Sequence, residues 1–179
     1  MFRTFGLQAL TGVSQPLFGD KLTAAMPIPQ AGVDAIAQVA NTAIYQVGDR
    51  ITFDPYTANQ DTLMVSKILT PTTMQVTSQG NAPQHAHAIN AVMCLSLSVG
   101  ELIIEPIDGG AGQVYLGSDN TVTAGGGGNT FHKLLKVAAG TMPNIFRATN
   151  SIAFNPIRTD DIWIAGSASD SYYAAAEII

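Results

Sequence analysis

The sequence predicts an all-β fold built from small β-barrel or β-sandwich modules, with an extended N-terminal arm. Apolar and polar residues alternate over short stretches, which is the pattern of a strand with one buried face. These stretches recur roughly every 8 to 12 residues and are separated by Gly, Pro, Asp and Asn. Only one segment has helical spacing, so we expect strands and turns to form nearly all of the chain.

Residues 1–32 have weak periodicity, with Pro16, Pro27 and Pro29 among scattered large apolar side chains. An apolar segment without a fold of its own usually lies against another surface, so we expect an extended arm over 1–32. The alternative is a first strand and loops that belong to the same core as the rest of the chain. Either way, the anchors are the large apolar residues Phe2, Phe5, Leu7 and Phe18.

Residues 33–108 are expected to form a β-barrel-like domain. A turn at Val47–Arg50 separates the strands TAIYQV and RITF. The other expected strands are VDAIAQV, TLMVSKIL, TMQVTS, INAVMCLSLSV and ELIIEPI. In TLMVSKIL, Leu63, Val65 and Ile68 face the core if the register slips near Lys67.

The glycine-rich run Asp108–Gly112 is the expected boundary, and residues 113–179 are expected to form a β-sandwich-like domain. QVYLG, DIWIAGSA and SYYAAAEII alternate as strands do, whereas FHKLLKVAAG fits a helix or a strand with a bulge. The pattern leaves open whether 33–179 has one core or two.

The composition limits the possible partners. Charged residues make up 12% of the chain, about half the usual fraction, and the net charge is −5. A surface with so little charge is suited to burial against other subunits. With eight Lys and Arg and no basic stripe, direct nucleic-acid binding is not expected. No apolar run is long enough for a membrane span or a signal peptide, so we expect a protein that is made in a cytoplasm and does not bind membranes.

A pair of histidines, His85 and His87, raises the question of a metal site. On a strand they would share one face, as two ligands in a cupin-like metalloenzyme do. The next acidic residue is Glu101 and the third histidine, His132, lies far along the chain, so no third ligand follows at metal-site spacing. We therefore expect the pair to hydrogen-bond backbone groups at the start of a strand, with no metal and no cofactor.

Other catalytic motifs are absent from the sequence. Gly125–Gly128 is not followed by the Lys-Ser or Lys-Thr of a phosphate-binding loop, and there is no GxSxG. Cys94 has no cysteine partner and lies in an apolar strand, where a buried thiol is expected. Asp49 and Asp54 occupy typical turn positions. We therefore expect no enzymatic activity.

Several stretches together resemble the structural proteins of tailed-bacteriophage virions. They are LQALTGVSQPLFGDKLTAA, YQVGDRITFDP, the histidine-containing loop before INAVMCLSLS, IIEPIDGGAGQVYLGSDNTVT and DIWIAGSASDSYY. The likeness is closest to capsid decoration (cement) proteins, which implies binding to the major capsid protein on the outside of the capsid, stabilisation of contacts between capsomers, and a homotrimer. A tail or head–tail connector protein, or a carbohydrate- or host-binding module, are the alternatives.

Exposed aromatic residues would serve binding to a capsid or binding to a carbohydrate. Trp163 suits a core or an interface but could bind sugar, and Tyr172 and Tyr173 suit a subunit contact. The residues expected at a capsid or subunit interface are therefore Phe2, Phe5, Leu7, Phe18, Trp163, Tyr172 and Tyr173.

Overall fold

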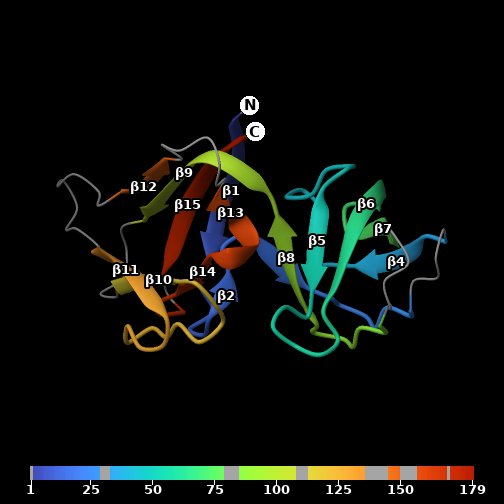
Figure 1. Cartoon of the computed structure of the whole chain (residues 1–179), viewed down its shortest axis with the longest axis horizontal. Helices are drawn as coiled ribbons and strands as arrows, with labels where there is room; N and C mark the ends of the chain where they lie inside the picture. The colour runs from blue at the N-terminus through green and yellow to red at the C-terminus, as the bar shows by residue number, and fades with distance from the viewer. Residues whose placement is uncertain are drawn as a thin grey trace. The chain divides into compact units, whose positions relative to one another are not determined.

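The expected all-β fold is confirmed. The computed structural model describes residues 2–28, 33–78, 85–107, 113–135, 145–149, 157–168 and 170–179, without the side chains of Gly6, Leu7 and Leu135 (Figure 1). Within these residues every regular element is a β-strand apart from one short 3-10 turn, η1 (Thr159–Asp161).

The chain forms two compact units. Unit 1 comprises Met1–Leu17 and Leu97–Ile179, and unit 2 is the continuous segment Phe18–Ser96. The chain therefore starts in unit 1, forms all of unit 2 and returns, whereas the sequence suggested domains in succession at 33–108 and 113–179. The expected joint at 108–112 lies outside the described residues.

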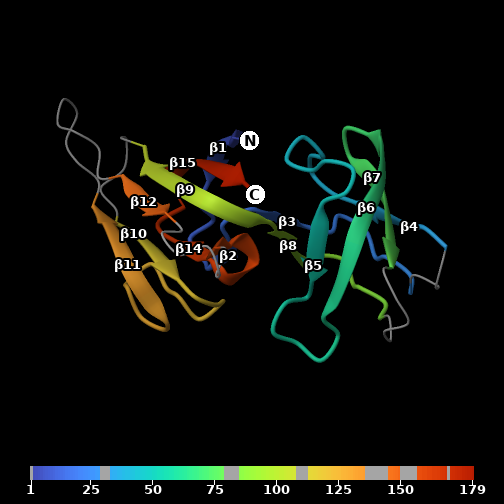
Figure 2. The same ribbon diagram turned by 45° about the horizontal axis from the view of Figure 1, so that its top comes forward.

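Unit 2 is a single antiparallel six-stranded sheet in the order β3-β8-β5-β6-β7-β4. Figure 2 shows β5, β6 and β7 side by side. The strands are β3 (Gly19–Lys21), β4 (Ala35–Gln38), β5 (Arg50–Phe53), β6 (Asp61–Thr70), β7 (Thr73–Ser78) and β8 (Val92–Ser96).

The sheet of unit 2 curls until its two edges meet. The Thr23 amide, just beyond β3, donates to the Gln38 carbonyl of β4 at 2.9 Å, and the Ala40 amide donates to the Asp20 carboxylate at 3.1 Å. Alternating side chains fill the interior, as in a small barrel. The fully buried ones include Ile51, Phe53, Leu63, Val65, Met74, Val76, Met93 and Leu95.

Most strands of unit 2 lie where the alternation placed them. RITF and TMQVTS are β5 and β7, and the slip expected near Lys67 is present as a register shift between Val65 and Lys67. The expected strand TAIYQV is wrong. Its residues form turns, because Thr42 and Tyr45 bond to Pro71 and Thr42 carbonyls instead of to a strand partner.

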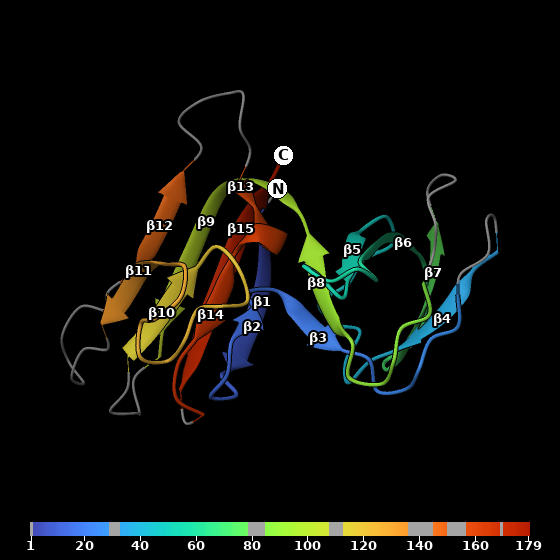
Figure 3. The same cartoon turned by 60° about the horizontal axis from the view of Figure 1, so that its bottom comes forward.

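Unit 1 contains two antiparallel sheets. Sheet A has the order β1-β15-β9-β12, with β13 also on β9, and sheet B has the order β11-β10-β14-β2. Figure 3 shows the strands of sheet B lying over those of sheet A. The bounds are β1 (Phe2–Ala9), β2 (Gln15–Pro16), β9 (Ser98–Pro106), β10 (Gln113–Gly117), β11 (Thr130–Leu135), β12 (Phe146–Thr149), β13 (Ile157–Arg158), β14 (Trp163–Ala165) and β15 (Ser171–Ile178). The segment that fitted a helix or a bulged strand is a strand over 130–135, with a register shift opposite Leu116–Gly117.

The N-terminal segment is part of the folded units and not the arm expected over 1–32. Residues 2–9 form β1, which pairs with β15, and Leu10 continues the pairing by donating to the Asp170 carbonyl at 2.9 Å. Leu17 is buried and bonds to Ile162. A register shift between Thr4 and Leu7 breaks the alternation of β1, which is why the sequence pattern looked irregular. Residues 29–32 lie outside the described part.

Candidate functional site

The residues expected at an interface separate into a buried group and an exposed pair. Phe5, Phe18, Trp163 and Tyr172 are each at most 5% exposed, so they belong to the cores. Phe2 and Tyr173 are 53% and 49% exposed. The side chain of Leu7 is not among those that the structure describes. The expectation is therefore corrected for the four buried residues. Strand alternation directs Phe5 and Tyr172 inward, Trp163 lies in β14, all of whose residues are buried, and Phe18 lies between β2 and β3.

Tyr172 illustrates why neighbouring tyrosines have different roles. Its hydroxyl donates to the Leu17 carbonyl at 2.6 Å, and its ring is fully buried. Burial raises the pKa of the Tyr172 phenol well above its ordinary value. Tyr173, the next residue of β15, points to the opposite face of sheet A because side chains alternate along a strand. Neither Tyr172 nor Trp163 is available to stack on a sugar.

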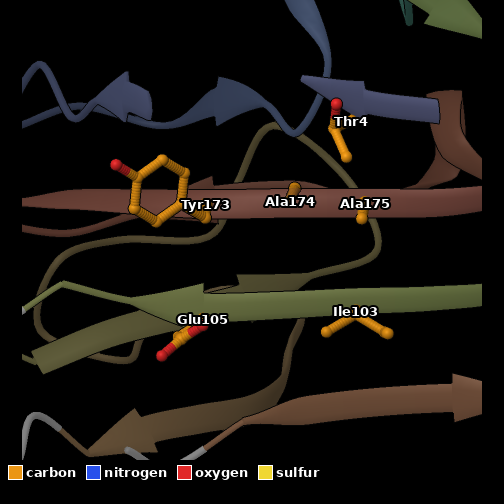
Figure 4. A pocket seen from close by; sticks show the side chains of 6 residues that line it. All are labelled: Thr4, Ile103, Glu105, Tyr173, Ala174 and Ala175. Carbon is orange, nitrogen blue, oxygen red and sulfur yellow. The ribbon is translucent and has the colours of Figure 1, made fainter. Parts of the chain in front are cut away.

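The outer face of sheet A is the best candidate for a functional surface. Three rows of cross-strand partners form it: Phe2–Glu177–Glu101, Thr4–Ala175–Ile103–Arg147 and Tyr173–Glu105. A depression of about 420 Å³ lies on this face (Figure 4). Its lining comes from β1, β9 and β15 and consists of Thr4, Ile103, Glu105, Tyr173, Ala174 and Ala175. The depression thus combines an aromatic ring, aliphatic groups and one carboxylate.

The charges on this face are unbalanced. Glu101 bonds to Arg147, and this hydrogen bond, followed by the attraction of the two charges, raises the pKa of the Arg147 guanidinium. Glu105 and Glu177 form no ion pair with any residue in the described ranges. The face therefore carries three glutamates against one arginine, and the one of them that is buried, Glu101, is paired with that arginine.

A second cluster surrounds the two histidines in unit 2. The His87 side chain is fully buried, with Nδ1 at 2.8 Å from Asp54 Oδ2 and Nε2 at 3.1 Å from Asp61 Oδ2. His85 Nδ1 lies 3.2 Å from Asp61 Oδ1, and the His85 amide donates to Asp61 Oδ2 at 2.6 Å. The backbone of His87 forms a two-way bridge with Met26. The cluster joins the end of β5, the start of β6 and the segment before β8.

The geometry of the histidine cluster fits a structural cross-link. Both ring nitrogens of His87 lie within hydrogen-bond distance of a carboxylate, so each has an aspartate partner. In the part of the chain that the structure describes, no group of three or more His, Cys, Asp or Glu is arranged to hold a metal ion. The expected bonding of the histidine side chains to backbone groups is wrong, because both rings bind aspartates. The main chain of His87 pairs with Met26, whereas the His85 amide donates to the Asp61 carboxylate.

The aspartate partners could not have been found from the sequence. Asp54 and Asp61 lie 33 and 26 residues before His87, and the sequence indicated only that Asp54 lies in a turn. Asp54 has a positive φ of 45°, which confirms its turn position. The pairing of β5 with both β6 and β8 brings the two carboxylates to the same imidazole.

The glycine run forms a defined loop. The Gly126 amide donates to the Thr123 carbonyl at 2.9 Å and the Gly127 amide donates to Thr123 Oγ1 at 2.9 Å. Gly126 and Gly128 have φ values of +80° and +71°, which explains the choice of glycine at both positions. These two amides therefore bond within the loop itself.

Comparisons with known proteins returned no match to a family model, a curated protein or a solved structure. No helix in the described part of the chain has the length and hydrophobicity needed to cross a membrane. The site must therefore be judged from its own chemistry.

Proposed function

We propose that this chain is a non-enzymatic structural protein of a tailed-bacteriophage virion, a cement protein that binds the outer capsid surface and stabilises contacts between capsomers. The observation that carries the proposal is the outer face of sheet A, where Phe2 and Tyr173 are exposed beside glutamates on a chain with few charges. The resemblance of several sequence stretches to virion proteins supports the same conclusion.

A rigid sheet face suits this role better than an arm. An arm loses about 1–2 kcal/mol of backbone entropy per residue when it becomes ordered on the capsid. The strands of sheet A are already ordered, so burial of Phe2 and Tyr173 contributes roughly 25 cal/mol per Å² of apolar area without that loss. Repetition over a capsid lattice then multiplies a modest affinity, since many copies bind neighbouring sites.

The division into two units supports a mechanism in which one chain binds two neighbouring capsid subunits at once. Each unit has its own core, so each can present a folded surface to a different capsid subunit. Unit 2 also exposes large apolar side chains, among them Ile36, Val47 and Ile89. Self-association into a trimer on the lattice is part of the proposal and is checked by sedimentation of the purified chain.

The burial of Trp163 and Tyr172 argues against the carbohydrate-binding alternative. A carbohydrate-binding module built on Trp163, Tyr172 and Tyr173 would need those rings at the surface, and two of them are in the core. A tail or connector protein uses the same physical principles as a cement protein and differs from it in copy number and location.

The test is the copy number of the chain in purified virions of the source phage. We expect quantitative mass spectrometry to give a copy number comparable to that of the major capsid protein, and labelled antibody to decorate the heads. A few copies at one vertex would mean a connector or tail protein. Absence from purified particles would overturn the proposal.

A further inference from the structure

We propose that the depression on the outer face of sheet A binds a lysine or arginine side chain of a partner protein, seated against the Tyr173 ring with its charge on Glu105. The inference deepens the proposed function and rests on it in one respect: that function identifies the partner as the major capsid protein. The chemistry of the subsite is argued from the face itself.

The placement of two side chains defines the subsite. Tyr173 and Glu105 are direct cross-strand partners on β15 and β9 and both line the depression, with the ring beside β15 and the carboxylate beside β9 (Figure 4). Tyr173 is 49% exposed, and Ile103 and Ala175 line the same depression. Long basic side chains pack their aliphatic stems on such surfaces while the charged head reaches a carboxylate. An arginine or lysine over a tyrosine ring gains a further cation–π attraction.

The charge of the face selects a basic partner. Glu105 and Glu177 have no ion-pair partner among the described residues, while Arg147 is occupied by Glu101. A negatively charged face repels phosphate groups, which disfavours nucleic acids and anionic lipids. Glu105 and Glu177 attract lysine and arginine, and complementary charge sets both the specificity and the rate of association.

The same charge argues against a second copy of this chain as the occupant. In a two-fold contact the same patch lies on both sides, so Glu105 and Glu177 would meet their own equivalents. In a trimer the patch would meet a different surface of the next copy, and that copy has the same excess of acidic residues. The chain as a whole has 13 acidic residues against eight lysines and arginines. The occupant is therefore expected to be a different protein, one with basic and apolar side chains next to each other.

The experiment uses the full chain and two probes. The first probe is a purified capsid of the source phage that lacks the chain, tested by co-sedimentation. The second is a short peptide of alternating leucine and arginine, tested by NMR titration against a matched leucine–glutamate peptide. The variants are Glu105→Lys, Glu105→Gln and Tyr173→Ser, with Tyr56→Ser as the control, because Tyr56 is equally exposed but lies in unit 2. Circular dichroism checks that each variant is folded.

We expect the arginine peptide to shift the resonances of Tyr173 and Glu105 saturably, and the glutamate peptide to leave them unchanged. Glu105→Lys should weaken binding of both probes by roughly tenfold or more, and Glu105→Gln and Tyr173→Ser by less. Tyr56→Ser should bind the peptide as the unmodified chain does. Added salt should weaken binding, because it screens the attraction between the charges.

The outcomes separate the two proposals. If the arginine peptide binds the face but the capsid does not bind the chain, the cement function fails and the subsite stands. If the capsid binds and the folded Glu105→Lys and Tyr173→Ser variants bind it equally well, the subsite is wrong and the function stands. The subsite is also overturned if neither probe perturbs Tyr173, or if Glu105→Lys dissociates an oligomer of the chain, which would make a second copy the occupant.

Discussion

The His87 side chain connects segments of unit 2 that are far apart in the sequence. Its buried ring holds Asp54 and Asp61 together, and Asp61 is only 3% exposed. We expect His87→Gln to lower the free energy of unfolding by about 2 kcal/mol, because at least one carboxylate loses a charge-assisted hydrogen bond. Urea unfolding measures the loss. His132→Gln, a change in unit 1, is the control and should cost clearly less. Equal losses would mean that the cluster adds nothing specific.

Gly128 tests whether the glycine loop is defined by its packing. A Cβ on Gly128 would lie 2.0 Å from the Thr121 carbonyl oxygen at a φ of +71°, whereas a Cβ on Gly125 would meet nothing closer than 3.9 Å. We expect Gly128→Ala to destabilise the chain by about 2 kcal/mol or more, since both the clash and the backbone conformation oppose it. Gly125→Ala should change stability by less than about 0.5 kcal/mol. Thermal unfolding of the two variants distinguishes this from a loop with no fixed conformation, in which both changes would be tolerated.

At the scale of elements, the alternation of β15 gives one strand two roles. Tyr172 closes the core of unit 1 and Tyr173 faces outward. The sequence indicated that these residues lie in a strand, yet it could not tell which tyrosine faces the core. A shift by one residue reverses every side chain of a strand, and only the pairing of β15 with β1 and β9 sets that choice.

The buried tyrosines predict how stability depends on alkaline pH. Burial raises the pKa of Tyr172, and burial followed by the charge of Asp20 raises the pKa of Tyr45. Because the folded state holds these protons more tightly, their contribution is fully present below the ordinary tyrosine pKa of about 10. It is lost as the pH rises above that value towards the raised folded-state pKa values.

We therefore expect base-induced unfolding above about pH 10, with phenolate absorbance rising together with the loss of the β-sheet circular dichroism signal. In Tyr172→Phe, stability should fall less steeply with pH in that range, although the bond to the Leu17 carbonyl is lost. Ionisation of Tyr172 in a still-folded protein near pH 10 would contradict this expectation.

At the scale of the whole molecule, the division into units makes a prediction about fragments. All strand partners of β3 to β8 lie within Phe18–Ser96. We expect this segment alone to fold and to unfold cooperatively in urea, as followed by circular dichroism. An unfolded fragment would mean that unit 2 depends on unit 1.

Deletion of residues 1–17 is the complementary experiment. It removes β1 and β2, one edge strand from each sheet of unit 1, together with the buried Phe5, Leu10 and Leu17. We expect loss of cooperative unfolding for unit 1, with unit 2 retained, as read by amide hydrogen exchange. A detachable arm would instead leave the protection of unit 1 unchanged.

The sequence by itself determined the all-β class, the positions of most strands and turns, and the shortage of charge. These properties are local, since alternation and turn chemistry act over a few residues. Only the tertiary structure decided that β1 pairs with β15, that Phe5, Phe18, Trp163 and Tyr172 are buried, and that His87 lies between two aspartates. Each of these depends on strands far apart in the chain, and periodicity cannot say which strands pair or which face of a strand meets the core.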